Sequence, residues 1–335
     1  GQVLQEGITE AGALSSFIAL STAYATWGQP MLPVYLFYSM FGFQRVGDLA
    51  WALGDMRGRG ILAGCTAGRT TLMGEGLQHD DGQSPLLASS NPAAVVYDAS
   101  FAYEVAVIME EAIAEMLGAD PKDRFWYLTL YNETYPMPAL PEGEEGAAIR
   151  QGIIEGIYRY APAPATSTRG DLRASLCFSG PMWSVALEAQ RVLAETYGVS
   201  ADAWAVTSWT NLRTDALEVE RWNRLHPEAP PRTARITAAL GNGLDPVVAI
   251  TDYMRSVPDQ ISRFVERPYT SLGTDGFGRS DARDALRSYF EVDAAHLVVA
   301  VLQQLASRGR VEPATVAAAI ADAGIDADRV APWLI

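Results

Sequence analysis

Short apolar segments alternate along this chain with longer segments whose apolar residues follow helical spacing. In residues 102–117, Val105, Ile108 and Met116 recur on one helical face, and a glycine follows as a stop signal. Such alternation predicts mostly parallel sheets with right-handed crossovers, and 335 residues suffice for about two domains. We therefore expect an α/β protein of two doubly wound, three-layer domains. The expected strands are residues 60–65, 94–97, 125–131, 174–178, 203–206 and 247–250, and the expected helices are residues 11–27, 102–117, 183–197, 282–290, 294–307 and 314–323.

Proline and small residues interrupt this alternation near the middle of the chain. The run Ala161-Pro162-Ala163-Pro164, with the Thr, Ser and Gly residues that follow, is typical of an interdomain linker. We therefore expect one domain over residues 1–160 and another over residues 161–335. Residues 136–146, rich in Pro, Gly and Glu, are expected to form a loop.

Residues 11–44 contain no charged side chain. The run is long enough to cross a membrane, but Gly28-Gln29-Pro30 and Pro33 interrupt it. We expect a buried helix over residues 11–27 and an irregular aromatic segment over residues 31–43. A place in the core or at a subunit interface, and no membrane span, is the favoured interpretation.

Acidic residues outnumber basic ones by 40 to 25, which gives a formal net charge of −15. Nucleic-acid binding needs clustered cations, so this balance argues against a nucleic-acid partner. Lys122 is the only lysine, which argues against Schiff-base chemistry on lysine and against a P-loop. Only three histidines are present, and Cys65 and Cys177 lie far apart. We expect no metal site in this chain, and reduced thiols in a cytoplasmic protein.

Glu10 is the last charged residue before the uncharged run. A carboxyl group at the entrance to an apolar helix is partly desolvated and suited to sharing a proton. A solvated acid in a first helical turn, favoured by the helix dipole, gives the same pattern. The residues alone leave both interpretations open.

Two further segments combine residue types that occur in binding sites. Residues 38–45, YSMFGFQR, place aromatic rings beside a glycine and an arginine, which suits stacking on a flat heterocycle or an aromatic corner of the core. Residues 74–83 form a Gly-rich segment after an expected strand. Its His79 is a candidate acid or base near neutral pH, and a structural loop capped by Asp80 or Asp81 is the alternative.

A resemblance to the homodimer-type E1 component of the pyruvate dehydrogenase complex is carried by the strings LQEGITEAGA, YSMFGFQRVGDL, AGRTTLMGEGLQHDDG, DASFAYEVAVIM, TSWTNLRTD, RWNRLHP and LGTDGFGRSD. This family belongs to the transketolase-like thiamin diphosphate enzymes, and the resemblance runs through the whole chain. It implies a pyrimidine-binding domain over residues 1–160, lacking its N-terminal part, and a transketolase C-terminal-like domain over residues 161–335.

The resemblance also implies roles for individual residues. Glu10 matches the glutamate that bonds N1′ of the cofactor's aminopyrimidine ring and shares a proton with it. Tyr38 and Phe41 match aromatic residues that line the aminopyrimidine pocket, and Arg45 belongs to the same cofactor-binding motif. His79 matches a catalytic histidine that helps to position a 2-oxo acid.

Two features of the loop around His79 qualify this match. Glu75 is implied to support the geometry of the loop. Family members often carry a second histidine just after the Asp-Gly of this loop, whereas Gln83-Ser84-Pro85 stands here. This departure puts the identity of the substrate and the acetyl-transfer step in doubt, but not the binding of the cofactor.

The family's GDG…N motif, which binds the diphosphate and Mg²⁺, is absent from this sequence. The resemblance implies that thiamin diphosphate and Mg²⁺ need an upstream N-terminal region, in the same polypeptide or in a separate chain, and Gly1 fits a cleavage or boundary. The other implied partners are a homodimer mate and an E2 lipoyl acyltransferase.

The implied reaction is decarboxylation of a 2-oxo acid, most simply pyruvate, with transfer of the acetyl unit to the lipoyl group of E2. A transketolase-type ketol transferase shares Glu10 and the fold, and is the first alternative. A non-catalytic fragment or assembly module is the second.

Overall fold

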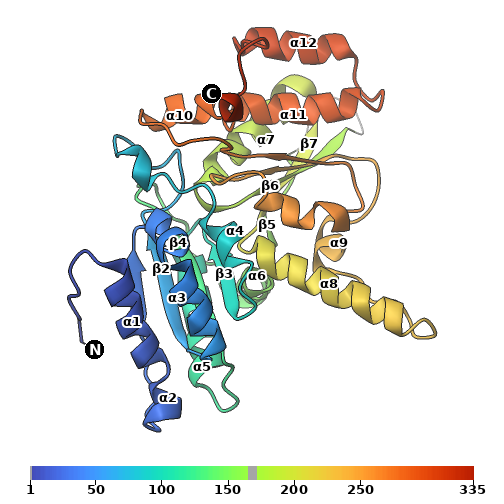
Figure 1. Cartoon of the computed structure of the whole chain (residues 1–335). Coiled ribbons are helices and arrows are strands. Elements are labelled where there is room, and N and C mark those ends of the chain that lie inside the picture. The colour runs from blue at the N-terminus through green and yellow to red at the C-terminus, as the bar shows by residue number, and fades with distance from the viewer. Residues whose placement is uncertain (1, 165–171) are drawn as a thin grey trace.

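The computed structural model describes residues 2–164 and 172–335. It contains two sheets with helices on both faces, which confirms the expected α/β class (Figure 1). The Thr, Ser and Gly residues predicted to continue the linker after Pro164 lie outside the described residues. Among the residues described, no helix is both long and apolar enough to cross a membrane.

The first sheet is parallel, with the strand order β1-β2-β4-β3. Its strands are β1 (Val34–Phe37), β2 (Gly60–Cys65), β3 (Ala94–Asp98) and β4 (Phe125–Leu130). Alternate side chains of β4 enter different clusters: Tyr127 packs on the side of α1 (Glu10–Ser21) and α3 (Phe43–Asp55), and Trp126 on the side of α5 (Ala102–Leu117). This alternation places helices on both faces of the sheet.

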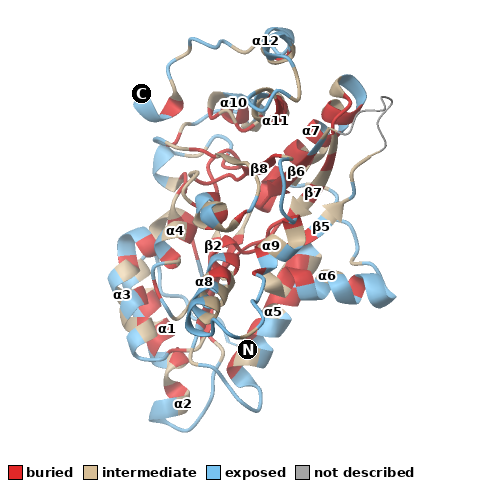
Figure 2. Cartoon of the chain, turned by 90° about the vertical axis from the view of Figure 1, so that its right-hand side faces the viewer, coloured by how far each residue is buried: buried red, intermediate tan, exposed pale blue. Residues whose placement is uncertain are grey.

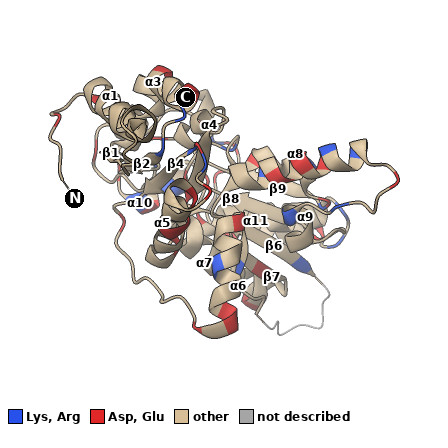
Figure 3. Cartoon of the chain, turned by 90° about the horizontal axis from the view of Figure 1, so that it is seen from below, with Lys and Arg blue, Asp and Glu red and all other residues tan. Residues whose placement is uncertain are grey.

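The second sheet has the order β5-β7-β6-β8-β9, and only β5 runs antiparallel. Its strands are β5 (Tyr158–Ala161), β6 (Arg173–Phe178), β7 (Ser200–Ala205), β8 (Val247–Ile250) and β9 (Tyr269–Leu272). Leu176 and Phe178 pack toward α7 (Trp183–Tyr197) and α11 (Ala294–Ala306), and Cys177 toward α8 (Trp209–Leu225). Helix α8 extends away from the body and carries charges of both signs (Figures 1 and 3).

One hydrophobic cluster passes from the first sheet into the second, because it contains Trp126 and Leu128 together with Leu176 and Phe178. Figure 2 shows the buried residues on the strands and inner helix faces, and exposed residues on the outer faces. The remaining described elements are α2 (Ala23–Thr26), η1 (Ser39–Phe41), η2 (Leu77–His79), α4 (Ser84–Ala88), α6 (Gly143–Glu155), η3 (Gly180–Met182), α9 (Arg235–Leu240), η4 (Pro258–Phe264), α10 (Arg283–Tyr289), α12 (Pro313–Asp322) and η5 (Pro332–Leu334).

Several local predictions were wrong. The segment expected to be irregular contains β1 and η1 and runs into α3, and the loop expected at 136–146 gives way to α6 at Gly143. The helix expected over residues 11–27 is divided into α1 and α2, and α1 is buried on one side only. The boundary between residues 160 and 161 remains a prediction, and β5, which spans it, pairs with β7 of the second sheet.

The carboxyl ends of strands from both sheets meet between the domains. Asp98, at the end of β3, accepts a hydrogen bond from the Thr129 hydroxyl at 2.7 Å, and its N–H donates to Thr207 O, just beyond β7, at 2.8 Å. Sites in open parallel sheets form at such edges, where loops leave the strands. Both the loop that carries His79 and the turn after β8 lie in this region.

Candidate functional site

Glu10 begins α1, where the Thr9 hydroxyl caps the helix by accepting from Gly12 N at 3.3 Å. A carboxylate in a first turn interacts favourably with the helix dipole. Its Oε1 lies 3.3 Å from Nη1 of Arg45, which comes from α3. The Glu10 side chain is 19% exposed, so it is neither a fully solvated surface acid nor sealed in the core.

The aromatic residues join this ion pair to His79. The Arg45 guanidinium carbon lies 3.9 Å from the centre of the Phe41 ring, a cation–π contact. The His79 ring stacks on Tyr38, with 4.6 Å between centroids, and lies 5.2 Å from the Phe41 centroid. All five residues predicted for the site, Glu10, Tyr38, Phe41, Arg45 and His79, are therefore linked by successive contacts.

Glu75 approaches the histidine from within its own loop. Its Oε2 lies 3.4 Å from Nδ1 of His79, although that nitrogen makes no hydrogen bond of good geometry. The contact is consistent with the supporting position implied for Glu75. Both side chains are partly buried, so the attraction between Glu75 and a protonated His79 is less screened than on an open surface.

Asp81 ties the aromatic segment to the loop of His79. Its carboxylate accepts hydrogen bonds from the hydroxyls of Ser39 and Ser84, and from the N–H groups of Gln83 at 3.0 Å and Ser84 at 2.9 Å. The Tyr127 hydroxyl joins the same network from β4. Asp81 therefore has the structural role that was the alternative for this loop, and it also fixes Ser39, the neighbour of Tyr38.

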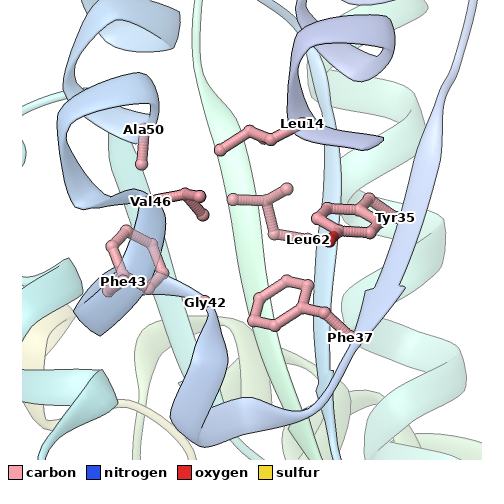
Figure 4. A pocket seen from close by; sticks show the side chains of 8 residues that line it. All are labelled: Leu14, Tyr35, Phe37, Gly42, Phe43, Val46, Ala50 and Leu62. Carbon is pink, nitrogen blue, oxygen red and sulfur yellow. The ribbon is translucent and has the colours of Figure 1, made fainter. Parts of the chain in front are cut away.

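A small apolar pocket lies between α1, α3 and the first two strands (Figure 4). Its lining residues are Leu14, Tyr35, Phe37, Gly42, Phe43, Val46, Ala50 and Leu62. Gly42 is required there, because an added Cβ would lie 2.0 Å from Cε2 of Phe37. The pocket offers hydrophobic contact alone, and neither Glu10 nor His79 lines it.

Asp80 lies directly beside His79 in the chain but points into the interior. It is 2% exposed, and neither carboxylate oxygen has a hydrogen-bond partner of good geometry among the described residues. It packs so closely against Gly278 that a Cβ there would lie 2.4 Å from its Oδ2. Burial raises the pKa of Asp80 to about 7, and Arg69 partly offsets this effect.

Asp80→Asn is expected to gain stability over the parent protein as pH rises. The unfolded carboxyl ionises near pH 4 and the folded one at about 7, so ionisation penalises folding increasingly across that interval. Below about pH 4 the parent carboxyl is as neutral as the amide, and the difference vanishes. Three pKa units correspond to roughly 4 kcal/mol as an upper bound. Urea unfolding at pH 5 and pH 8 measures the difference in unfolding free energy between the variant and the parent. If this difference is the same at both pH values, the raised pKa of Asp80 is contradicted.

No cluster of His, Cys, Asp and Glu able to hold a metal ion occurs in residues 2–164 or 172–335. The residues around Glu10 instead fit one end of a flat, nitrogen-containing ring. They offer a carboxylate, two aromatic faces and a guanidinium, and that guanidinium is already engaged by Glu10 and the Phe41 ring.

Comparisons with known families match both halves of the chain. The model described as "Pyruvate dehydrogenase E1 component middle domain" matches residues 1–138, and the one described as "Transketolase-like TK C-terminal domain" matches residues 140–293. The two matches meet at residues 138–140, in the segment between β4 and α6.

Curated proteins named "Pyruvate dehydrogenase E1 component" match nearly the whole chain. That of Pseudomonas aeruginosa is 50% identical over 333 residues, which are 99% of this chain and 37% of the relative. Those of Mycobacterium tuberculosis and Escherichia coli K12 are 48% and 47% identical, over 99% and 100% of this chain but only 35% and 36% of their own lengths. The chain thus spans a little over one third of the curated relatives that it matches.

Solved transketolases share the fold at low sequence identity. The enzyme from Leishmania mexicana superposes with a TM-score of 0.64 at 17% identity, over 90% of this chain and 37% of its own. A split-gene transketolase, solved as an inactive beta4 tetramer, gives a TM-score of 0.58 at 16% identity, over 89% of this chain and 82% of its own. These likenesses concern the fold alone.

Proposed function

Because this chain belongs to the pyruvate dehydrogenase E1 component family and matches a C-terminal portion of its members, we propose that it forms the aminopyrimidine- and substrate-binding part of a thiamin diphosphate-dependent E1 enzyme. The complete enzyme decarboxylates pyruvate and transfers the acetyl unit to the lipoyl group of E2. The observation that carries the proposal is the contiguous array from Glu10 through Arg45, Phe41 and Tyr38 to His79.

Thiamin diphosphate supplies an electron sink for the loss of CO₂ when it is bound. In this chain, Glu10 binds N1′ of the aminopyrimidine ring and holds the shared proton, while Arg45 orients its carboxylate. Tyr38 and Phe41 provide aromatic surface for the ring. The diphosphate and Mg²⁺ are assigned to the region that precedes this portion in the longer relatives.

His79 is proposed to bind the 2-oxo acid and to move a proton at one of its ring nitrogens. Glu75 lies beside Nδ1, which leaves Nε2 as the nitrogen directed to the substrate. The stacking of the ring on Tyr38 restricts its rotation, so the histidine is oriented before the substrate arrives. Tyr38 is itself 45% exposed in the single chain, and we propose that a second copy in a cytoplasmic homodimer covers this open side.

The test is an assay of the full-length protein, which includes the diphosphate-binding region, with thiamin diphosphate and Mg²⁺. We expect pyruvate-dependent acetylation of a lipoyl domain and no transfer between ketose phosphates. Activity on the sugar phosphates alone supports the transketolase-type alternative and overturns the proposal. Failure to bind thiamin diphosphate supports the assembly-module alternative.

A further inference from the structure

The loop that carries His79 has two buried stems and an exposed tip. We define the site loop as residues 66–83, which connect β2 to α4 with a single short 3-10 turn, η2. Residues 67–72 and 80–82 are buried, whereas residues 73–79 are exposed or partly exposed. The position of His79 at the tip therefore depends on what holds the stems.

The first stem is held by Asp252, which follows β8 in the C-terminal domain and is fully buried. Its carboxylate accepts from Arg69 N at 3.0 Å, from Thr70 N at 3.0 Å and from the Thr70 hydroxyl at 2.7 Å. Gly68 permits this approach, because a Cβ there would lie 2.1 Å from Oδ2 and the residue has φ +83°. Hydrogen bonds to a buried carboxylate are stronger than neutral ones.

The second stem is held by the turn after β8, where Met254 N donates to Gly82 O at 2.8 Å. The first stem has further contacts after β9, because the Arg69 side chain donates to the carbonyls of Thr274 and Gly276. The two stems are also joined to each other, because Asp81 N donates to Gly68 O at 3.2 Å.

Helix α10 adds one more contact from the same domain. Its Arg283 Nε donates to Thr71 O at 3.0 Å, just before the exposed tip begins. Asp252, Met254 and Arg283 thus hold the stems from the C-terminal domain. The first domain also contributes, because the Ser39 hydroxyl donates to Asp81 and Ala67 N donates to Leu130 O at 3.0 Å.

We propose that Asp252 is a positioning residue for His79: it touches neither cofactor nor substrate, and acts by fixing the first stem of the site loop. Its catalytic consequence rests on the proposed function, whereas its hold on the loop does not. The C-terminal domain thereby contributes to the reaction although none of the predicted site residues belongs to it.

Asp252→Asn in the full-length protein tests this role. The amide keeps the size of the side chain but offers one acceptor oxygen and turns an NH₂ group toward the stem donors. We expect faster amide hydrogen exchange in residues 66–83 with or without cofactor. We also expect a fall of about 10²-fold in kcat with pyruvate, because a small misplacement of a catalytic group costs that much. Thiamin diphosphate affinity should hold, since Glu10, Tyr38 and Phe41 lie on other segments.

Asp293→Asn is the matched control. Asp293 caps α11 in the same domain by accepting from His296 N at 2.9 Å, and its contacts do not include the site loop. Asparagine caps helices about as well as aspartate, and this variant should leave loop exchange and kcat as in the parent. The proposal is overturned if the site loop exchanges equally fast in Asp252→Asn and Asp293→Asn. It is also overturned if exchange in Asp252→Asn rises uniformly through the C-terminal domain.

A pair of variants on the loop side covers a failure of Asp252→Asn to fold. Thr70→Val removes the hydroxyl donor and leaves the C-terminal domain unchanged, and should lower kcat about tenfold with faster loop exchange. Thr70→Ser restores the hydroxyl and should restore both. If Thr70→Val and Thr70→Ser have the same kcat and the same rate of loop exchange, Asp252 does not act as proposed. The two proposals can also fail separately. If the parent protein has no activity with pyruvate but Asp252→Asn or Thr70→Val still speeds amide exchange in the site loop, the positioning role is supported and the proposed function is overturned.

Discussion

Glu10→Gln is expected to lower kcat of the full-length protein by about 10²–10⁴-fold, the range typical of a lost proton-transfer group. Glutamine preserves the size of the side chain and can accept a hydrogen bond from Arg45, which lies 3.3 Å from the carboxylate. It cannot hold the proton that Glu10 is proposed to share with the aminopyrimidine ring. The fold should survive, because the side chain lies at the rim of α1 and outside the hydrophobic clusters.

The measurement is steady-state turnover of pyruvate at saturating thiamin diphosphate, with thermal unfolding recorded beside it. Glu6→Gln is the matched control, since Glu6 is an exposed acid on the same segment and makes no described contact with the site. It should behave like the parent. Unchanged turnover in Glu10→Gln would refute the role given to Glu10.

His79→Ala is expected to reduce kcat/KM for pyruvate by about 10²-fold or more, with little change in thiamin diphosphate affinity. His79 is the only histidine in the described part of the first domain, so no second imidazole of that domain can take over its proton transfer. Cofactor affinity should persist because Glu10, Tyr38 and Phe41 remain. Titration of thiamin diphosphate by fluorescence, beside the pyruvate assay, separates the two effects.

Packing and chemistry at this position can be distinguished by a second substitution. His79→Phe keeps a ring that can stack on Tyr38, whose centroid lies 4.6 Å from that of the histidine, but removes both nitrogens. It should be as impaired as His79→Ala. A phenylalanine variant with parental activity, or an alanine variant that loses only cofactor binding, would contradict the proposed role. His226→Ala, on an exposed residue of α8's C-cap, is the control.

The repeating hydrophobic pattern made most strands and helices of the core predictable. Residues 60–65, 102–117, 183–197 and 247–250 have the bounds expected from their apolar spacing. The failures share a cause. Strand β1 is an edge strand behind a proline, with no clear alternation of apolar and polar residues, and α1 is buried on one side only. Local pattern carries little information where packing is one-sided.

For the site, the residue types indicated which chemistry each side chain could perform, but not which side chains lie close together. Glu10, Tyr38 and His79 were brought to one site only by the family resemblance, because contacts between residues so far apart in sequence depend on the whole fold. A capping role for Asp81 in its loop was predicted as an alternative, but its hydrogen bond with Ser39 was not. Asp252 gave no local signal at all, since its partners lie more than 180 positions earlier in the chain.

The cluster shared by the two sheets bears on how a gene for such a protein can be divided. A break between residues 138 and 140, where the two family matches meet, would separate Trp126 and Leu128 from Leu176 and Phe178. Each product would carry bare core surface, which in water favours aggregation. Physical chemistry thus penalises a division of the gene between the two domains.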